Sequence, residues 1–344
     1  GSFVPELGEN PGITRVYRIS GDRLLVRGYL PPFTGGMLTE RYAVLRPDGS
    51  RDTGAETMLG NGVEVIAVSS AGHVFIATPV PNAPVYPSVE VTRLRTDLTA
   101  DAGFAAVSVQ GGLAAEAMAD GRLFLRVENG TIRDSAGTAR SGLCRITGAG
   151  LVDTTFAPPV ILGGMASMPR EAPGGRLVIA GSFTSVNGVA RVAIARLLDN
   201  GSLDSSFVPP TSGMPQFPSI EVFAVEPSGK VVVYGRYRSA NAREANDSVL
   251  TRLNADGTWD PGVDHVINVF NNLGIGTIVP RDNGDVLVAG SFAHLGGGPN
   301  LSVARLTANS FQANAVRLSV GVPEEGSAYL DIRLTGKVAF PRFR

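Results

Sequence analysis

Short apolar segments recur along the chain in pairs, and the two members of each pair have different signatures. The first member follows a turn rich in Gly, Asp and Asn, in segments 22–28, 72–78, 121–127, 175–181, 229–235 and 284–290. The second member ends in Leu or Ile, in segments 40–45, 89–94, 142–146, 192–197, 248–253 and 301–306. Runs of this length, rich in Val, Ile, Phe and Tyr and bounded by turn residues, predict β-strands. A sustained 3.6-residue period, which would predict helices, is missing from the sequence.

These pairs repeat with a period of about fifty residues. The last residues of the second strands are 49, 52, 51, 56 and 53 residues apart, at Leu45, Leu94, Ile146, Leu197, Leu253 and Leu306. Another extended stretch precedes the first strand, as in 63–69 and 220–226, and a closing segment with an aromatic residue follows the second, as in 201–210. Four strands in about 50 residues is the size of a propeller blade. We therefore predict an all-β chain, a β-propeller of four-stranded antiparallel blades.

The predicted propeller is a single domain over residues 3–344. Its six clear repeats cover approximately 9–58, 59–108, 109–158, 159–210, 211–263 and 264–315, and are called repeats 1 to 6 below. Segment 316–334 resembles the first two strands of a repeat, 338–343 resembles the next strand, and Phe3-Val4-Pro5 matches the Phe-Val-Pro of 207–209. We predict that 316–344 and 3–8 form a seventh, composite blade that hides the sheet edges. The alternatives are six blades with a C-terminal hairpin, or the start of a truncated β-sandwich.

The most regular repeat, GGRLVIAGSFTSVNGVARVAIARLLDNGSLDSSFVPP at 174–210, resembles the delta-60 repeat. That family consists of tandem propeller-like repeats in large bacterial secreted or surface proteins. The pattern recurs at 228–262 and 283–306 and is degenerate in repeats 1 to 3. The resemblance implies a secreted or cell-surface location in a bacterium and a binding or scaffolding role. It implies no catalytic residues.

Composition and charge exclude several classes of function. With 30 basic and 31 acidic residues and a net charge of −1, the chain has no general excess of positive charge for a nucleic-acid partner. The sequence contains no apolar run of about 18 residues, so we expect no membrane insertion. The 43 glycines and 23 prolines favour turn-rich structure. Gly1-Ser2 is typical of a cloning remnant, and we expect a mature or excised, monomeric module of a larger chain.

An Arg and an Asp lie eight residues apart in four consecutive repeats: Arg93/Asp101, Arg145/Asp153, Arg196/Asp204 and Arg252/Asp260. Repeat 1 keeps Asp52 but has Val44 in place of the Arg, and repeat 6 keeps Arg305 but has Ala313 in place of the Asp. The intervening turn would let the two side chains face each other as a structural ion pair. The alternative is a ring of guanidinium groups that lines an axial channel and holds an anion.

We predict no catalytic residues, no cofactor and no metal site. The acids specific to one repeat have no spacing that links them into a glycosidase pair: Glu64, Glu116, Glu221 and Asp264. The three histidines, His73, His265 and His294, are scattered over three repeats. Turns such as 199–204 offer oxygen ligands but lack a full calcium-loop pattern, so calcium is retained only as an alternative. The single cysteine, Cys144, excludes an internal disulfide and is predicted to be a small buried side chain.

We favour a non-enzymatic module that binds a protein or a glycan through loops on one rim, at 30–39, 78–88, 128–140 and 236–248. Tyr29 and Tyr237 lie beside such loops, unless they take the slot of Phe183 and Phe292 and pack between blades. The alternative function is a carbohydrate-active enzyme, a glycoside hydrolase or lyase, which would gather repeat-specific carboxylates, Arg or Tyr at one place. A third class is a structural spacer without a concave site.

Overall fold

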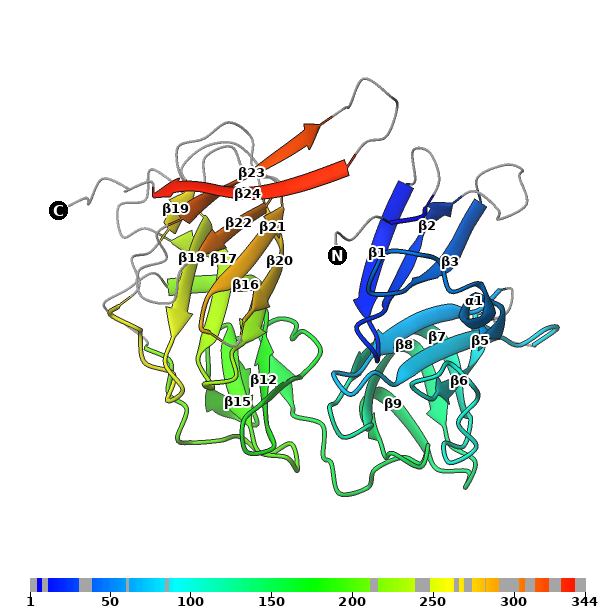
Figure 1. Cartoon of the computed structure of the whole chain (residues 1–344). Helices are drawn as coiled ribbons and strands as arrows, with labels where there is room; N and C mark the ends of the chain where they lie inside the picture. The colour runs from blue at the N-terminus through cyan, green and yellow to red at the C-terminus, as the bar shows by residue number, and fades with distance from the viewer. Residues whose placement is uncertain are drawn as a thin grey trace. The chain divides into compact units, whose positions relative to one another are not determined.

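The computed structural model describes residues 5–7, 12–30, 39–59, 62–83, 87–210, 216–238, 248–262, 266–268, 274–281, 283–290, 303–306, 313–321 and 329–337. These residues form antiparallel sheets and one short helix, so the described chain is all-β in character (Figure 1). The chain divides into two compact units, Gly1–Pro158 and Pro159–Arg344, and each is described by itself.

The N-terminal unit contains two sheets, with strand orders β1-β2-β3 and β4-β5-β6-β7-β8-β9. Its elements are β1 (Gly12–Arg18), β2 (Leu24–Leu30), β3 (Thr39–Leu45), α1 (Thr53–Met58), β4 (Glu64–Val68), β5 (Val74–Pro79), β6 (Ser88–Leu94), β7 (Val107–Ala117), β8 (Leu123–Arg133) and β9 (Ala139–Ile146).

The C-terminal unit contains four sheets, with orders β10-β13-β14, β11-β12-β15, β16-β17-β18-β19 and β20-β21-β22-β23-β24. Its first strands are β10 (Ile161–Leu162), β11 (Arg170–Ala172), β12 (Arg176–Ala180), β13 (Ser185–Val186), β14 (Val189–Ala190), β15 (Ile194–Leu197), β16 (Gln216–Val225) and β17 (Val231–Arg238). The remaining strands are β18 (Ser248–Leu253), β19 (Val266–Asn268), β20 (Ile275–Pro280), β21 (Val286–Gly290), β22 (Val303–Leu306), β23 (Ala313–Gly321) and β24 (Tyr329–Lys337).

All twelve segments predicted from the paired pattern are strands. The six first members are β2, β5, β8, β12, β17 and β21, and the six second members are β3, β6, β9, β15, β18 and β22. In every repeat the two strands are direct antiparallel neighbours. The period of the sequence therefore corresponds to a period of the structure.

The sheets do not keep the uniform four strands that we expected. In the described residues, four strands form a separate sheet only in repeat 5, as β16-β17-β18-β19. The reason is visible in β7, whose residues 107–110 pair with β6 of repeat 2 and whose residues 108–117 pair with β8 of repeat 3. One strand thus closes one repeat and opens the next, which merges two repeats into a six-stranded sheet. In the same way β23 pairs with β22 over 313–315 and with β24 over 314–321.

Helix α1 is an element that the sequence pattern did not predict. It follows Asp52 in repeat 1, where repeats 2 to 4 have a short turn before a Phe. The Asp52 side chain accepts a hydrogen bond from the Ala55 N–H at 3.3 Å and so caps the helix N-terminus. Ala55 and Leu59 are buried against the core of repeats 1 and 2. A helix of six residues would be unstable by itself in water, so this packing is what stabilises it.

Within each unit, the core lies between the sheets of successive repeats. One cluster joins Leu25 and Val44 of repeat 1 to Val65 and Val74 of repeat 2, and all four side chains are fully buried. In the C-terminal unit a cluster joins Tyr234 of repeat 5 to Val286 and other residues of repeat 6. Because one small sheet cannot bury both of its faces, each repeat is stabilised mainly by its neighbours.

A glycine at the end of the first strand recurs because the neighbouring backbone passes very close to it. A Cβ added at Gly28, Gly181, Gly235 or Gly290 would lie 2.1–2.5 Å from a carbonyl oxygen of the adjacent segment. At Gly28, Gly235 and Gly290 the partner strand carries a register shift at the same place. The glycine therefore leaves room for a β-bulge in the preceding strand.

We predict that Gly235→Ala destabilises the C-terminal unit by about 2–3 kcal/mol, because backbone atoms must move to admit the methyl group. The measurement is the midpoint of urea unfolding followed by circular dichroism. Gly274→Ala is the matched control, since no atom lies within 4 Å of its added Cβ, and its expected effect is below about 0.5 kcal/mol. Equal stability of the two variants would show that the close approach imposes no constraint.

Candidate functional site

The turn after the second strand has the same geometry in repeats 1 to 5. The strand forms a bridge with the residue six positions later, as in Leu94 with Ala100 and Leu197 with Leu203. The N–H of the following Asp then donates to the carbonyl of the residue eight positions before it, as in Asp204 to Arg196 at 2.8 Å. In four of these turns an Asp or Asn oxygen also accepts from the backbone N–H two residues on. This local geometry brings positions eight residues apart together.

In all four pairs the Arg Nε donates to the Asp Oδ2. The distances are 2.7 Å for Arg93–Asp101, 2.8 Å for Arg145–Asp153, 2.8 Å for Arg196–Asp204 and 2.7 Å for Arg252–Asp260. The side chains are largely buried, and Arg145 is only 1% exposed. Each Arg is therefore joined to its Asp by a side-chain bond and by the backbone bond of the turn.

Two further contacts recur around each pair. The second carboxylate oxygen of the Asp accepts from the backbone N–H two residues on, at 2.9–3.0 Å. In repeats 2, 3 and 4 the guanidinium Cζ lies 5.0 Å from the centre of a Phe ring, namely Phe104, Phe156 and Phe207. We call the Arg and the Asp eight residues later, together with the Phe in repeats 2 to 4, the arginine bracket.

The arginine bracket also reaches the next repeat. Arg93 of repeat 2 donates through Nη1 to the carbonyl of Gly121 in repeat 3, at 3.0 Å. Arg196 of repeat 4 donates through Nη1 to the carbonyl of Ala255 in repeat 5. One guanidinium group thus holds a turn of its own repeat and the backbone of its neighbour.

The two repeats that lack half of the sequence pattern replace it with another residue. In repeat 6, where Ala313 stands in the Asp position, Asp285 at the start of the first strand lies 2.7 Å from Arg305 Nε. The equivalent position holds Arg176 in repeat 4 and Lys230 in repeat 5, and these cations contact Asp204 and Asp260. In repeat 6 the carboxylate that pairs with the Arg therefore comes from the start of the neighbouring strand and not from the turn. The sequence spacing alone did not show this.

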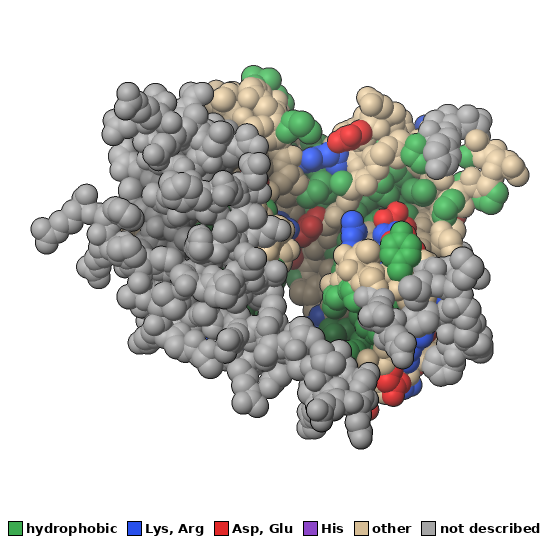
Figure 2. Space-filling view, turned by 90° about the horizontal axis from the view of Figure 1, so that it is seen from above, with side chains coloured by type: hydrophobic (Ala, Val, Ile, Leu, Met, Phe, Trp, Pro, Cys, Tyr) green, Lys and Arg blue, Asp and Glu red, His purple; other side chains and the backbone are tan. Residues whose placement is uncertain are grey.

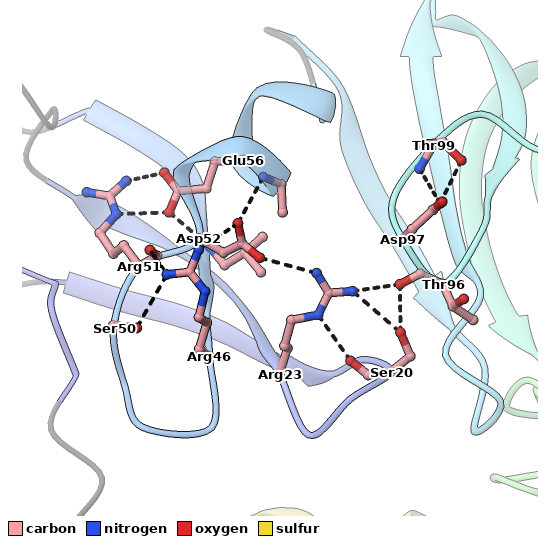
Figure 3. A network of polar contacts seen from close by, with 12 residues as sticks. Ser20, Arg23, Arg46, Ser50, Arg51, Asp52, Glu56, Thr96, Asp97 and Thr99 are labelled. Atoms are coloured by element: carbon pink, nitrogen blue, oxygen red, sulfur yellow. Dashed lines mark hydrogen bonds and ion pairs between the residues drawn. The ribbon is translucent and has the colours of Figure 1, made fainter.

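In repeat 1, where Val44 stands in the Arg position, two other arginines supply the positive charge (Figure 3). Asp52 contacts Arg46 Nη2 at 3.1 Å and Arg23 Nη1 at 3.4 Å. Arg23 also donates to the carbonyl of Thr96 in repeat 2, at 2.7 Å. Close by, Arg51 forms a two-bond pair with Glu56 of α1, at 2.9 and 2.5 Å. The link between repeats 1 and 2 is thus made by different residues at the same place.

The carboxylates of the brackets are held in their charged form. Burial alone would raise the pKa of Asp204, but hydrogen bonds from Ser206 and from Arg196, and the charge of Arg196, lower that pKa to about 2. The pKa values of Asp101, Asp153 and Asp260 are also lowered, by the same kinds of contact acting against burial.

The other candidates from the sequence lie apart from one another. His73 is half-buried and close to Ser69, while His265, His294 and Asp264 lie outside the described residues. Cys144 is 2% exposed, and burial raises the pKa of its thiol to about 12. Within the ranges given above, His, Cys, Asp and Glu do not form any group of three that could hold a metal ion. The helical structure described there lacks the length and apolar character that a membrane crossing needs.

Of the repeat-specific acids, Glu64 takes part in a cluster that the sequence spacing did not reveal. Arg27 Nη1 lies 3.1 Å from Glu64 and Arg27 Nε lies 3.1 Å from Glu40, with the guanidinium 5.8 Å from the centre of the Tyr42 ring. The cluster lies between repeats 1 and 2. Its signal in the sequence is that Arg27 and Tyr42 replace the smaller apolar residues Ala180 and Ile194 of the most regular repeat.

Tyr29 does not take the slot of Phe183. Leu30 is fully buried, as Phe183 is, whereas Tyr29 is 52% exposed. The close-approach glycines Gly28 and Gly181 occupy the same position in their repeats and fix this alignment. Tyr237 lies in β17, and its side chain is outside the described structure.

Comparison with known families gives a match in repeats 4 to 6. Residues 173–207, 226–262 and 282–311 match the family model described as "Domain of unknown function (DUF5122) beta-propeller". This match supports a repeat of the propeller kind in that part of the chain, and the delta-60 name stays a prediction. None of the curated protein sequences compared with the chain matches it.

Two solved structures are similar over most of this chain. PorZ, an essential bacterial surface component of the type-IX secretion system of Porphyromonas gingivalis, has 16% identity and a TM-score of 0.44, over 91% of this chain and 42% of PorZ. Prolyl oligopeptidase B from Galerina marginata has 8% identity and a TM-score of 0.40, over 96% of this chain and 52% of that one. The chain thus spans about half of these proteins or less, and similarity at this level does not establish a shared function.

We predict that Arg196 and Asp204 are strongly coupled. Arg196→Met or Asp204→Asn alone should each cost about 3–5 kcal/mol of unfolding free energy, because either leaves a buried charged group without its main partner. A double-mutant cycle in urea should give a coupling energy of about 1–3 kcal/mol. The exposed pair Arg18–Asp22, whose side chains are 77% and 69% exposed, is the control, with an expected coupling below about 1 kcal/mol. Similar coupling in both pairs would show that burial does not strengthen the bracket.

The lowered carboxylate pKa values predict a loss of stability in acid. Asp204 has a folded pKa of about 2 against an ordinary value of 3.8, so its contribution is fully present above about pH 4 and is lost as the pH falls to about 2. The shift corresponds to about 2 kcal/mol. Urea midpoints measured from pH 5 to about pH 2 should fall less steeply for Asp204→Asn than for the wild-type chain. Parallel curves would show that Asp204 does not contribute.

Proposed function

We propose that the chain is a non-enzymatic binding or scaffolding module of a larger bacterial secreted or cell-surface protein, and that it engages a protein or glycan partner through loops on one rim. The observation that carries this proposal is the use of the recurring charged residues. In the described repeats each bracket Arg is held by a carboxylate, and Arg93 and Arg196 also bind the following repeat. The residues that recur thus have a structural use, and recognition falls to residues found in one repeat.

We propose in particular that the bracket pairs Arg93/Asp101, Arg145/Asp153, Arg196/Asp204 and Arg252/Asp260 are structural and do not form an anion site. Each Arg Nε is directed to a carboxylate of its own repeat. A guanidinium already paired in this way has less capacity to bind a free anion. The pairing thus supports a structural role for these residues. We also propose that the module works without a cofactor or metal.

We further propose that the repeats form one propeller with a composite closing repeat. The β23–β24 hairpin supports this idea, because β23 passes from repeat 6 into a new antiparallel pair in the way that β7 passes from repeat 2 into repeat 3. At the N-terminus, the Glu6 N–H donates to the carbonyl of Gly49 in the turn of repeat 1. A similar bond joins repeats 4 and 5, where the Val208 N–H donates to the carbonyl of Asp256 in the turn of repeat 5. Six blades with a C-terminal hairpin remain the alternative. Residues 3–4 and 338–344 lie outside the described chain.

The rim segments support a recognition role because they differ between repeats. Segment 128–140 extends β8 and β9 into a hairpin, with Ile132 paired to Arg140 and a turn at Asp134. Segment 78–88 is closed by the bond from the Val80 N–H to the Ser88 carbonyl, at 2.9 Å. Segments 31–38 and 239–247 lie outside the described residues.

One observation favours the second candidate, a carbohydrate-active enzyme. Glu40 and Glu64 share the guanidinium of Arg27, and this is the gathering of repeat-specific residues that an enzyme would need. Most glycosidases also use a pair of carboxylates, which flank the bond that is cleaved. Only the enzyme would release cleaved products, so a cleavage assay distinguishes the two candidates.

The test incubates the full chain with a panel of polysaccharides and follows two readouts. Retention in affinity gels measures binding, and new reducing ends or unsaturated products measure cleavage. Capture of extracellular proteins from the source cells, checked with purified candidates, covers the protein partner. We expect binding to a glycan or a purified surface protein without cleavage, and weaker binding for the rim variant Glu128→Ala/Arg133→Ala. Cleavage would establish the enzyme, and a chain that binds neither class would contradict the proposal.

A further inference from the structure

One face of the β1-β2-β3 sheet changes character along its strands. Residues directly opposite each other on antiparallel strands point to the same face. The register therefore gives three successive rows on this face: Tyr17–Leu25–Val44, Arg15–Arg27–Tyr42 and Gly12–Tyr29–Glu40. They are called the apolar row, the polar row and the open row.

The apolar row belongs to the core between repeats 1 and 2. Leu25 and Val44 are fully buried, and Tyr17 packs against the same cluster. The Tyr17 hydroxyl lies 3.4 Å from the Val65 carbonyl of repeat 2. This row fixes the sheet of repeat 1 against the first strand of repeat 2.

The side chains of the polar row are held in place by contacts within repeat 1 and with repeat 2. Tyr42 accepts a hydrogen bond from the Val65 N–H at 2.8 Å, and Arg15 donates to the Tyr17 hydroxyl at 3.2 Å. Arg27 contacts Glu40 on its own sheet and Glu64 on repeat 2, both at 3.1 Å. The side chain of Arg27 is 22% exposed and that of Glu64 is 55% exposed, so these groups are held in place and are still accessible.

The open row leaves an aromatic ring accessible on one flank. Tyr29 is 52% exposed. A Cβ at Gly12 would lie 3.5 Å from Tyr29 Cβ and 3.6 Å from its ring carbon Cδ2, so the absence of a side chain at Gly12 keeps that flank clear. The described part of the N-terminal unit, seen from above, presents acidic, basic and apolar side chains close together (Figure 2).

Other repeats carry less charge and polarity at the equivalent positions. The positions of Arg27 and Tyr42 hold Ala77 and Val91 in repeat 2, Arg126 and Leu143 in repeat 3, Ala180 and Ile194 in repeat 4, and Tyr234 and Leu250 in repeat 5. Most of these side chains are buried in the cores between repeats. Since apolar pairs there are generally at least as stabilising as charged ones, the charged set in repeat 1 points to a ligand.

The chemistry of the rows indicates the kind of ligand. Arg15 and Arg27 balance Glu40 and Glu64, so the set has no net charge to attract an ion. It offers guanidinium donors and carboxylate acceptors beside an exposed aromatic ring, a combination that suits a ligand with many hydroxyl groups and a C–H face.

We propose that the open and polar rows bind a neutral oligosaccharide, with Tyr29 stacking on a sugar ring and Arg27, Glu40 and Glu64 bonding its hydroxyl groups. This inference rests on the function proposed above and names its partner class and its site. Tyr29 and Glu40 also flank segment 30–39, one of the loops that the sequence indicated.

The experiment titrates the full chain with chitotetraose, cellotetraose and maltotetraose by calorimetry and by saturation-transfer NMR, with sialyllactose as the acidic comparison. We expect at least one neutral tetrasaccharide to bind and sialyllactose to bind more weakly. Tyr29→Ala should weaken binding by about tenfold or more and Glu64→Gln by about fivefold. Tyr29→Phe keeps the ring and should stay within about threefold of the wild-type chain.

The controls remove comparable groups outside the rows. Asp22→Asn deletes a carboxylate from the exposed pair with Arg18, and Leu151→Ala deletes an exposed apolar side chain. Both should bind as the wild-type chain does, and thermal unfolding of every variant checks the fold.

Three results would overturn the inference: no binding of any neutral tetrasaccharide, preference for sialyllactose, or equal binding by Tyr29→Ala and Glu64→Gln. Binding of a protein partner alone would leave the proposed function standing and this inference wrong. Cleavage of a tetrasaccharide that depended on Tyr29 and Glu64 would contradict the proposed non-enzymatic function, but it would still support a sugar site at these rows.

Discussion

The structure depends on a guanidinium group that is bonded in three directions. In repeats 2 and 4 one Arg holds the carboxylate of its own turn, lies against a Phe ring and donates to the backbone of the next repeat. A Lys could supply the charge, but it could not present a planar group to three partners at once. The local turn and the packing between repeats are therefore coupled through one side chain, and the apolar core forms around that coupling.

The sequence predicted the parts of the fold that follow from local pattern. Alternating apolar strands, turn residues and the spacing of eight between Arg and Asp are all properties of a short segment, and the twelve strands lie where that pattern indicated. It failed where a distant contact decides the outcome. Helix α1 depends on the buried packing of Ala55 and Leu59, and the partner of Arg305 is Asp285 on a neighbouring strand rather than a residue eight positions later. The exposure of Tyr29 required the alignment that Gly28 and Gly181 provide.

Recurring and unique residues divide the work of this chain. The bracket residues recur in repeats 2 to 5, where each Arg is paired with its Asp, and Arg93 and Arg196 also bond to the next repeat. The polar row of repeat 1 departs from that pattern, and only the three-dimensional register brings Arg27, Glu40 and Glu64 together. A sequence repeat therefore helps to locate function by contrast, since it shows which side chains the architecture does not require.

The passage of β7 from repeat 2 into repeat 3 has a consequence for how the N-terminal unit opens. It is one continuous strand that pairs with β6 over residues 107–110 and with β8 over residues 108–117. Repeat proteins commonly open one repeat at a time, because each repeat contacts only its neighbours. Here the opening of either repeat would break backbone bonds of the other, so we expect repeats 2 and 3 to open as one cooperative unit, with amide protons that exchange together.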